Sequence, residues 1–383
     1  MYPTIQVSGS ARERGRQHGE AGRERVRASI EGYKEVFDHY AGWDWPRTRA
    51  EAARFRAPIE EYGQDFAQEI CGIAEGAAAD ELDVLALNVR TEIMFAATAR
   101  DVAGGPRLPA ECSAFAAVPP RTAPGRVLLG ENWDWIPHAA DTTVIIEARR
   151  DGAPDYVTVV EAGLLAKLGM NSSGVGVVAN ALVSCDDRGR AAVPFHVLLR
   201  ALLDAETISD ALSALQRADR SSSGNFLIAH EDGVALDIEA APGDYTQLFL
   251  QAPEDGLILH TNHFTTNSSP DAAVSLVAMP DSPFRLQRLR ALVDEAARPL
   301  EAAFFREVLA DHATFPLGIC CHPDMRQPAP ERSATLASVV MDLPGRRMWL
   351  APGNPCVAPW TELDYSDRLH KPSPLTATVS ISA

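Results

Sequence analysis

The feature that most constrains the fold is a change of hydrophobic periodicity at Cys112. Ahead of it, apolar residues such as Val26, Ile30, Tyr33 and Phe37 recur at spacings of three and four, which is typical of one face of a helix. From Cys112 onward, short runs rich in β-branched residues follow one another, as strands do. The chain therefore predicts a helical N-terminal part joined at one cysteine to a part built on β-sheets.

The same patterns predict the individual elements. We expect helices over residues 10–41 and 47–78, and a third helix that opens at Asp80 as its N-cap. After a first strand that begins at Cys112 we expect, in chain order, strands over 126–134, 143–148, 156–161 and 174–182, helices over 194–203 and 207–218, strands over 225–229, 234–239, 245–250 and 257–263, helices over 283–297 and 301–311, and strands over 335–342 and 346–351. Residues 169–174 are predicted to form a turn, and the proline-rich stretch from Pro352 a surface tail. This order predicts an α+β fold in which two mainly antiparallel sheets stack and helices cover their outer faces.

Charge and composition narrow the class of partner. The 383-residue chain carries a net charge of −17, which argues against a nucleic-acid partner because phosphate binding needs a basic face. The arginines between Arg12 and Arg27 are interleaved with glutamates, so we expect a solvated helix face. No apolar run approaches the roughly 20 residues that span a bilayer, and no secretory signal opens the sequence. We therefore expect a cytoplasmic protein without a membrane partner.

The six cysteines lack the spacing of a disulfide framework, so we expect free thiols and no disulfide. Cys112 follows a loop rich in glycine and proline. It can be read as a small buried residue, which most free cysteines are, or as a reactive thiol.

A second cysteine-containing group invites a metal hypothesis. Cys320, Cys321 and His322, with His312 nearby, suggest zinc, but they lack a second closing pair at metal-ligand spacing. We therefore expect no metal, and assign the group to helix-end packing or to a wall of the substrate pocket. Cys356 is assigned a structural role.

Four motifs, taken in their order and spacing, resemble the penicillin acyltransferase family of N-terminal-nucleophile hydrolases and acyltransferases. They are Cys112-Ser113-Ala114-Phe115, Glu131-Asn132-Trp133-Asp134-Trp135, Thr261-Asn262-His263 and Thr335-Leu336-Ala337-Ser338-Val339-Val340-Met341-Asp342. Residues 9–20 also resemble the family's pro-segment. The resemblance implies a four-layer αββα sandwich over residues 112–383, preceded by a helical pro-segment over residues 1–111.

The resemblance further implies a precursor that cuts its own peptide bond between Glu111 and Cys112. The freed α-amino group, with a pKa of about 8, would take the proton of a thiol whose ordinary pKa is about 8.5, so no histidine base is required. The implied enzyme is a C–N amide hydrolase or an N-acyltransferase that works through an acyl-Cys112 intermediate. Its substrate would be a small-molecule amide or acyl thioester, acyl-coenzyme A among the candidates, with no bound cofactor. The two cleaved chains would stay associated as a heterodimer.

Four further residues receive roles from the resemblance. Asp134 would hold and orient the new amine, with a turn-capping aspartate as the alternative. Asn262 matches the family's side-chain oxyanion donor. Asn180 resembles the position whose backbone N–H completes the oxyanion hole, with a strand-end turn residue as the alternative. Arg332 matches more loosely an arginine that fixes the charge network or a substrate carboxylate.

Two residues depart from the family pattern. Glu111 stands where the fungal acyltransferase has glycine, and Glu131 stands where the related hydrolases have arginine. Recognition of an anionic substrate is therefore not carried over from those hydrolases.

Two other functions stay open on the residues alone. One is an uncleaved cysteine hydrolase in which His260, His263 or His138 serves Cys112 as base. The other is a binding protein that keeps the fold and does not mature.

Overall fold

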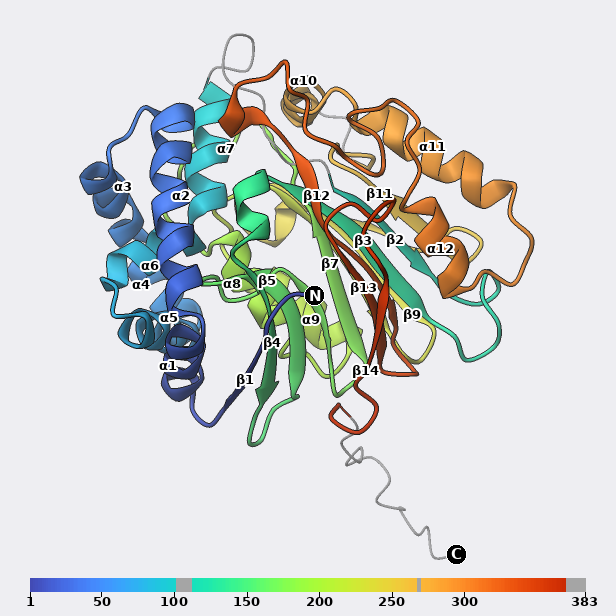
Figure 1. Ribbon diagram of the computed structural model, residues 1–383, viewed down its shortest axis with the longest axis horizontal. Coiled ribbons are helices and arrows are strands. Elements are labelled where there is room, and N and C mark those ends of the chain that lie inside the picture. The colour runs from blue at the N-terminus through green and yellow to red at the C-terminus, as the bar shows by residue number, and fades with distance from the viewer. Residues whose placement is uncertain (101–111, 267–269, 370–383) are drawn as a thin grey trace, which may run out of the picture.

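Two β-sheets packed face to face form the centre of the molecule (Figure 1). The computed structural model describes residues 1–100, 112–266 and 270–369. The larger sheet contains, in spatial order, β1 (Thr4–Ser8), β4 (Thr143–Arg149), β5 (Tyr156–Glu161), β6 (Leu168–Asn171), β7 (Val175–Asn180), β8 (Gly224–His230), β9 (Val234–Ala240) and β10 (Leu248–Gln251). The smaller sheet contains β11 (Leu257–His260), β2 (Ser113–Ala117), β3 (Leu128–Trp135), β12 (Ala334–Asp342), β13 (Arg347–Pro352) and β14 (Thr361–Asp364). Its strands β2 and β3 lie against β7 and β8 of the larger sheet.

Helices cover both outer faces of this pair of sheets. Helices α8 (Phe195–Leu202) and α9 (Ile208–Gln216) contact the larger sheet, whereas α11 (Ser282–Asp294) and α12 (Ala302–Val308) contact the smaller one. A short helix, α10 (Val274–Ala278), lies ahead of α11. The predicted α+β fold, with its αββα order of layers, is confirmed.

The alternation of β2 shows how the layers are held together. Ala114 and Ala116 belong to the core between the sheets, whereas Phe115 and Ala117 belong to a second core beneath the helices. The ring of Phe115 stacks on that of Phe305 in α12, with centroids 3.7 Å apart. All residues of β2, β3 and β12 are buried, because a sheet covers one face of these strands and helices cover the other.

The N-terminal helices form a further layer beside the larger sheet. They are α1 (Ala11–Ala21), α2 (Arg23–Ala41), α3 (Trp45–Ala52), α4 (Arg56–Tyr62), α5 (Gln64–Ala77), α6 (Glu81–Asn88) and α7 (Arg90–Arg100). Ser29 donates a 2.9 Å hydrogen bond to the carbonyl of Ala162, and Tyr62 donates one of 3.0 Å to Ala214 in α9. The segment before Cys112 therefore packs directly on the catalytic layers proposed from the sequence.

Several boundaries differ from the sequence predictions. The helix expected over residues 10–41 is interrupted at Gly22, which ends α1 by donating its N–H to His18 and precedes α2. The region expected to be helical over 47–78 is divided where Gly63 adopts an extended backbone. The capping box predicted at Thr207 and Asp210 is present.

Three strands were missing from the prediction. β1 pairs with β4 in parallel, so the first residues of the chain belong to the larger sheet. Leu168–Asn171, assigned mainly to a turn, forms β6, and the predicted surface tail contains β14. These strands are only four or five residues long, so they carry few alternating positions and the signal for them is correspondingly weak. Residues 370–383 of the predicted tail lie outside the described residues.

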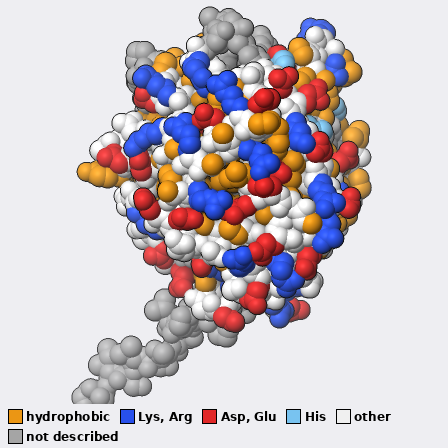
Figure 2. Space-filling model, turned by 90° about the vertical axis from the view of Figure 1, so that its left-hand side faces the viewer, with side chains coloured by type: hydrophobic (Ala, Val, Ile, Leu, Met, Phe, Trp, Pro, Cys, Tyr) orange, Lys and Arg blue, Asp and Glu red, His pale blue; other side chains and the backbone are white. Residues whose placement is uncertain are grey.

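The outer face of the N-terminal layer is highly charged (Figure 2). Lys and Arg side chains are interspersed there with Asp and Glu, and several form ion pairs, including Arg16–Glu20 at 2.6 Å and Arg56–Glu81 at 2.8 Å. The prediction that the N-terminal arginines form a solvated helix face is confirmed for Arg16, whose side chain is about half exposed. It is wrong for Arg14, which is buried and forms a 3.1 Å ion pair with the buried carboxylate of Glu69 in α5. Across residues 1–100, 112–266 and 270–369, no helix is both long and apolar enough to cross a bilayer.

The close crossing of α1 and α5 depends on glycine. A Cβ atom added to Gly76 would overlap the backbone oxygen of Arg16. Two residues later, Ala78 ends α5 in the left-handed conformation, with φ of 50°, which favours glycine over residues with a side chain.

We predict that opposite exchanges at these neighbouring positions have opposite effects on stability. Gly76→Ala should destabilise the protein by about 1–3 kcal/mol, because an added methyl group overpacks the crossing. Ala78→Gly should be neutral or stabilising by up to about 1 kcal/mol. Urea unfolding of both variants measures the two values. An increase of about 0.5–1 kcal/mol for Gly76→Ala, as in an ordinary exposed helix, would show that the crossing is not tight.

Candidate active site

Cys112 lies at the end of the smaller sheet, directly before β2, and is buried. Because alternate side chains of a strand share one face, Cys112 has the same parity as Ala114 and Ala116 and points between the sheets. Its Sγ atom lies 3.8 Å from the carbonyl oxygen of Asp134.

Burial raises the pKa of the Cys112 thiol to about 12. The carboxyl groups of Glu131 and Asp134 contribute to this raised pKa, whereas the ammonium group of Lys167 and a backbone hydrogen bond of Asp134 lower it. In the full-length chain the thiol is therefore protonated at neutral pH, and its proton must pass to an acceptor when the sulfur attacks.

The strand registers bring the predicted site residues to the same end of the sheet. The pairing of β2 with β3 and with β11, continued beyond the strand, places Trp133 and Asn262 level with Cys112. Asp134 pairs with Thr335 of β12, beside an irregularity in the register of that strand pair. Such bulges are frequent next to active sites because they redirect a side chain.

Arg285 of α11 joins several of these groups. Its Nη1 atom donates to the carbonyl of Cys112 at 2.7 Å and to Oγ of Ser113 at 3.1 Å, and its Nη2 atom donates to Oδ1 of Asn262 at 3.0 Å. Asp281 accepts from its Nε atom at 2.7 Å. The Arg285 guanidinium is completely buried, so these contacts hold it in one orientation.

The contacts of Asn262 define which of its atoms can act as a donor. Oδ1 accepts from Arg285, which identifies the other amide atom as the NH₂ group, and one N–H of that group is used by the carbonyl of Ala181 at 3.0 Å. Among the described residues Ala181 is the acceptor of this group, so the second N–H can serve another acceptor. This orientation is the one that an oxyanion donor requires.

Asn180 ends β7 of the opposite sheet and is completely buried. Its Oδ1 atom accepts a 3.2 Å hydrogen bond from Asn225, and its Nδ2 atom has no acceptor among the described residues. The next residue, Ala181, lines the same small cavity as Cys112.

That cavity has a volume of about 20 Å³, which is room for about one water molecule. Aromatic rings from both parts of the chain form much of its wall: Phe95, Trp133, Trp135 and Phe195. Because Phe95 belongs to α7, the N-terminal layer closes the space around Cys112 in the full-length chain.

Arg332 lies elsewhere. Its Nε atom donates to the carbonyl of Gln327 at 3.0 Å, and the residue borders a different cavity of about 270 Å³ together with Ile136 and His138. No hydrogen bond or ion pair of the described chain joins Arg332 to Cys112. Glu111, the residue before the predicted cleavage point, lies outside the described residues.

A buried ion pair connects the two sheets next to Cys112. Lys167 approaches Oε1 of Glu131 at 2.9 Å and donates to the carbonyl of Ala179 at 2.5 Å. The backbone N–H of Ala179, in β7, donates to Oε2 of Glu131, in β3, at 2.7 Å. Both carboxylate oxygens of Glu131 are thus satisfied by the opposite sheet or the segment that leads to it.

A second buried group connects the N-terminal layer to the site. Arg90 of α7 forms a 2.7 Å ion pair with Glu161 and lies 4.3 Å from the ring of Trp135. It also donates from Nε to Nε2 of His196 at 3.1 Å, while Nδ1 of His196 contacts the carbonyl of Ala166 at 2.9 Å. His196 therefore carries its proton on Nδ1, and both of its nitrogens are occupied.

The three histidines considered as bases have other partners. His260 contacts Glu239 at 3.0 Å; burial lowers its pKa, but Asp237 and Glu239 outweigh burial and raise it above the ordinary value. His263 contacts Oγ of Ser282 at 2.7 Å. His138 borders the cavity of Arg332 and packs against Tyr33. In the part of the chain that the structure describes, none of the three contacts the sulfur of Cys112.

Sequence reasoning missed Arg285, Lys167 and Arg90. The sequence did carry a signal for Arg285. Arg285, Leu289 and Val293 are spaced four residues apart, so they share the buried face of α11. A charge in an apolar helical stripe marks a buried partner. Lys167 and Arg90 had no comparable local signal.

We predict that breaking the Lys167–Glu131 pair makes stability depend on pH. In Lys167→Met, Glu131 keeps a buried charge without its counter-ion, which costs about 3–5 kcal/mol at pH 8. Burial already raises the pKa of Glu131, and a folded pKa above the unfolded value favours folding at low pH and loses this contribution as pH rises. The loss should therefore be smaller at pH 5. Urea unfolding at both pH values measures it.

The control is the double variant Glu131→Gln/Lys167→Met, which removes both charges. It should recover most of the stability lost at pH 8. An equal loss at the two pH values, with no recovery in the double variant, would contradict the role given to the ion pair.

Comparison with known proteins identifies the family of the chain. The sequence profile of the family acyl-coenzyme A:6-aminopenicillanic acid acyl-transferase matches residues 121–356, more than half of the chain. The chain is 28% identical over 359 residues to the 40 kDa form of acyl-coenzyme A:6-aminopenicillanic-acid-acyltransferase from Emericella nidulans, with 92% of each sequence covered.

The likeness to solved structures is weaker. A single-residue variant of a conjugated bile acid hydrolase from Clostridium perfringens superposes with a TM-score of 0.49 at 14% identity, covering 68% of this chain and 94% of the hydrolase. Penicillin V acylase from Agrobacterium tumefaciens gives a TM-score of 0.45 at 13% identity, with 68% and 88% covered. By the extent of the sequence match, this chain belongs to the acyl-coenzyme A:6-aminopenicillanic acid acyl-transferase family.

Proposed function

We propose that the chain is a self-cleaving enzyme whose Cys112 becomes an N-terminal nucleophile. It forms an acyl-Cys112 intermediate from a small-molecule amide or acyl thioester, and either water or an amine then accepts the acyl group. Acyl-coenzyme A is a candidate acyl donor, supported by the name of the Emericella nidulans relative. The proposal needs no bound cofactor.

The observation that carries this proposal is a buried thiol to which none of the described histidines forms a hydrogen bond. Cys112 needs a proton acceptor because burial raises its pKa to about 12. Among the described histidines, His196 alone borders the cavity of Cys112, and Arg90 and Ala166 occupy its two nitrogens. An α-amino group on Cys112 itself would supply the base in the same residue.

Self-cleavage needs no reactant other than water. The sulfur of Cys112 attacks the carbonyl carbon of Glu111, the C–N bond breaks, and the proton from the thiol goes to the departing nitrogen. This step already frees the α-amine of Cys112. Water then hydrolyses the resulting thioester, which frees the thiol of Cys112 and leaves a carboxylate on Glu111.

After cleavage, we propose that the two chains remain together as a heterodimer. β1 is paired along its length with β4, and Arg90 and Tyr33 of the N-terminal layer both bind the buried carboxylate of Glu161. Cutting one peptide bond leaves these contacts in place. The N-terminal chain would thus form part of the substrate pocket.

The roles of the surrounding residues follow from their positions. We propose that Asp134 orients the new amine, and that Asn262 and Asn180 stabilise the oxyanion of the tetrahedral intermediate. Arg285 acts as a positioning residue, because it fixes the amide of Asn262 and the carbonyl of Cys112. We assign the charge-network role to Arg285 instead of Arg332, which contacts Gln327 beside a different cavity.

The aromatic wall of the cavity supports an apolar acyl group as the part of the substrate that is bound. A cytoplasmic location is also proposed, because the free cysteines suit a reducing compartment.

Intact mass under denaturing conditions tests self-cleavage. The wild-type protein, a chain of 41.3 kDa, should give two fragments of about 12 and about 29 kDa, since the thiol of Cys112 performs the cut. Cys112→Ala should give one full-length chain. Cys71→Ser, which replaces a partly buried cysteine in α5, is the matched control and should be cleaved like the wild type.

A single full-length mass for the wild-type protein would remove the α-amino base and with it the proposal. Cleavage of Cys112→Ala at the same bond would show that another protein performs the cut.

A further inference from the structure

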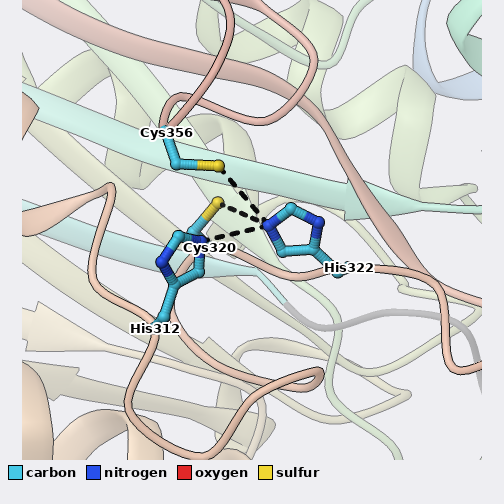
Figure 3. A group of neighbouring side chains, drawn as sticks. All are labelled: His312, Cys320, His322 and Cys356. Carbon is cyan, nitrogen blue, oxygen red and sulfur yellow. Dashed lines mark hydrogen bonds between the residues drawn. The ribbon is translucent and has the colours of Figure 1, made fainter.

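Four side chains from two loop segments, the α12–β12 connection and the β13–β14 connection, meet at one point (Figure 3). His312 follows α12, Cys320 and His322 lie ahead of β12, and Cys356 lies between β13 and β14. Each offers one nitrogen or sulfur atom, and the four atoms all lie within 4.8 Å of one another. We name these residues the His₂Cys₂ group. The fold supplies the fourth residue, Cys356, that sequence spacing had not connected with the others.

We propose that the His₂Cys₂ group binds one zinc ion. Two imidazoles and two cysteines form one of the common ligand sets of structural zinc sites. Two thiolates also balance the charge of a divalent cation, so the bound site is neutral. The function proposed for Cys112 does not use these residues, and the inference is independent of it.

The distances within the group fit a tetrahedral ion. With Zn–N distances of about 2.0–2.1 Å and Zn–S distances of about 2.3 Å, tetrahedral ligand atoms lie about 3.3 Å apart for two nitrogens and about 3.6 Å for nitrogen and sulfur. Here Nε2 of His312 and Nε2 of His322 are 3.1 Å apart, and Nε2 of His322 lies 3.5 Å from the sulfurs of both Cys320 and Cys356. These three separations, all measured from Nε2 of His322, match three edges of such a tetrahedron, and the remaining separations are within 4.8 Å.

Neighbouring groups hold the ligands in place. The side-chain amide of Asn354 donates to the sulfur of Cys320 at 3.5 Å and to the carbonyl of Cys321 at 2.6 Å. The backbone N–H of Cys320 donates to the carbonyl of Asp311 at 3.0 Å. Hydrogen bonds of this kind orient metal ligands and raise affinity. His312 is exposed, whereas Cys320 is buried, so an ion can enter from the side of His312.

The position of the group gives the ion a structural role. With four protein ligands the coordination sphere is closed, as in structural and not catalytic zinc sites. Cys321, between two of the ligands, exchanges hydrogen bonds with Thr335, the residue paired with Asp134: Thr335 N–H donates to its carbonyl and Oγ1 of Thr335 accepts from its N–H, both at 3.0 Å. Ile319, just ahead of Cys320, accepts from Asn132 at 2.6 Å. Zinc would thus fix the loops that support the strand end carrying Asp134.

Metal analysis of the full-length protein tests the inference. The protein is produced with zinc, purified with a thiol reductant and desalted to remove weakly bound metal. Elemental mass spectrometry should then find one zinc per chain. Cys71→Ser, which lies in α5, should keep it, whereas Cys320→Ser/Cys356→Ser should lose it. Because the double variant could fold poorly, His312→Ala, at an exposed ligand, serves as a second variant. Competition with a chelator should show its zinc affinity reduced by more than about tenfold.

Cobalt(II) substitution gives an independent readout of geometry. The wild-type protein loaded with cobalt should show visible absorption bands of a tetrahedral ion and a thiolate-to-cobalt band in the near ultraviolet, and the double variant should show neither. The inference is overturned if wild-type protein retains no more zinc than the double variant, or if its cobalt form lacks these bands. A disulfide between Cys320 and Cys356 in protein alkylated directly in the cell lysate would overturn it as well, because oxidation removes both thiolates.

Discussion

The ion pair between Glu131 and Lys167 is the interaction on which the rest of the site depends. Glu131 belongs to the smaller sheet, and its two oxygens are bound by Lys167 and by the backbone of β7 in the larger sheet. The pair therefore sets how the ends of β3 and β7 meet, and these ends carry Asp134 and Asn180. A buried ion pair is weak evidence for added stability. Its effect here is to fix geometry. The two buried charges stay paired in only one relative position of the two sheets.

The N-terminal layer has two roles in this account. It closes the cavity of Cys112 through α7, and it contributes Arg90, which binds Glu161 and also fixes the tautomer of His196. These contacts explain how a segment that resembles a pro-segment can remain bound after cleavage. They also occupy both nitrogens of His196, which borders the cavity of Cys112, and so remove it from consideration as a base. The same contacts thus favour an N-terminal nucleophile over an uncleaved cysteine–histidine pair.

Much of the fold could be predicted because the spacing of hydrophobic residues in the sequence distinguishes helices from strands. Cys112 and Asp134 lie at strand ends that alternation places correctly, and the αββα order follows from the succession of strands and helix pairs. β1 was not predicted because an edge strand of five residues gives little periodic signal, and its parallel partner β4 lies far along the chain. Lys167 could not be assigned because its partner Glu131 is in another sheet. Cys356 could not be joined to Cys320 and His322 because the β12–β13 hairpin lies between them. Contacts of this kind depend on tertiary structure and have no local pattern.

The most direct test of the account follows the acyl group. Purified protein would be exposed briefly to a short-chain acyl thioester, digested, and its peptides identified by mass spectrometry. The account predicts a peptide that begins at Cys112 with a free α-amine and carries the acyl group on its sulfur, in a linkage that hydroxylamine removes. An intact peptide spanning residues 111 and 112, with no acyl group on Cys112, would contradict the claim that nucleophile and base reside in this one residue.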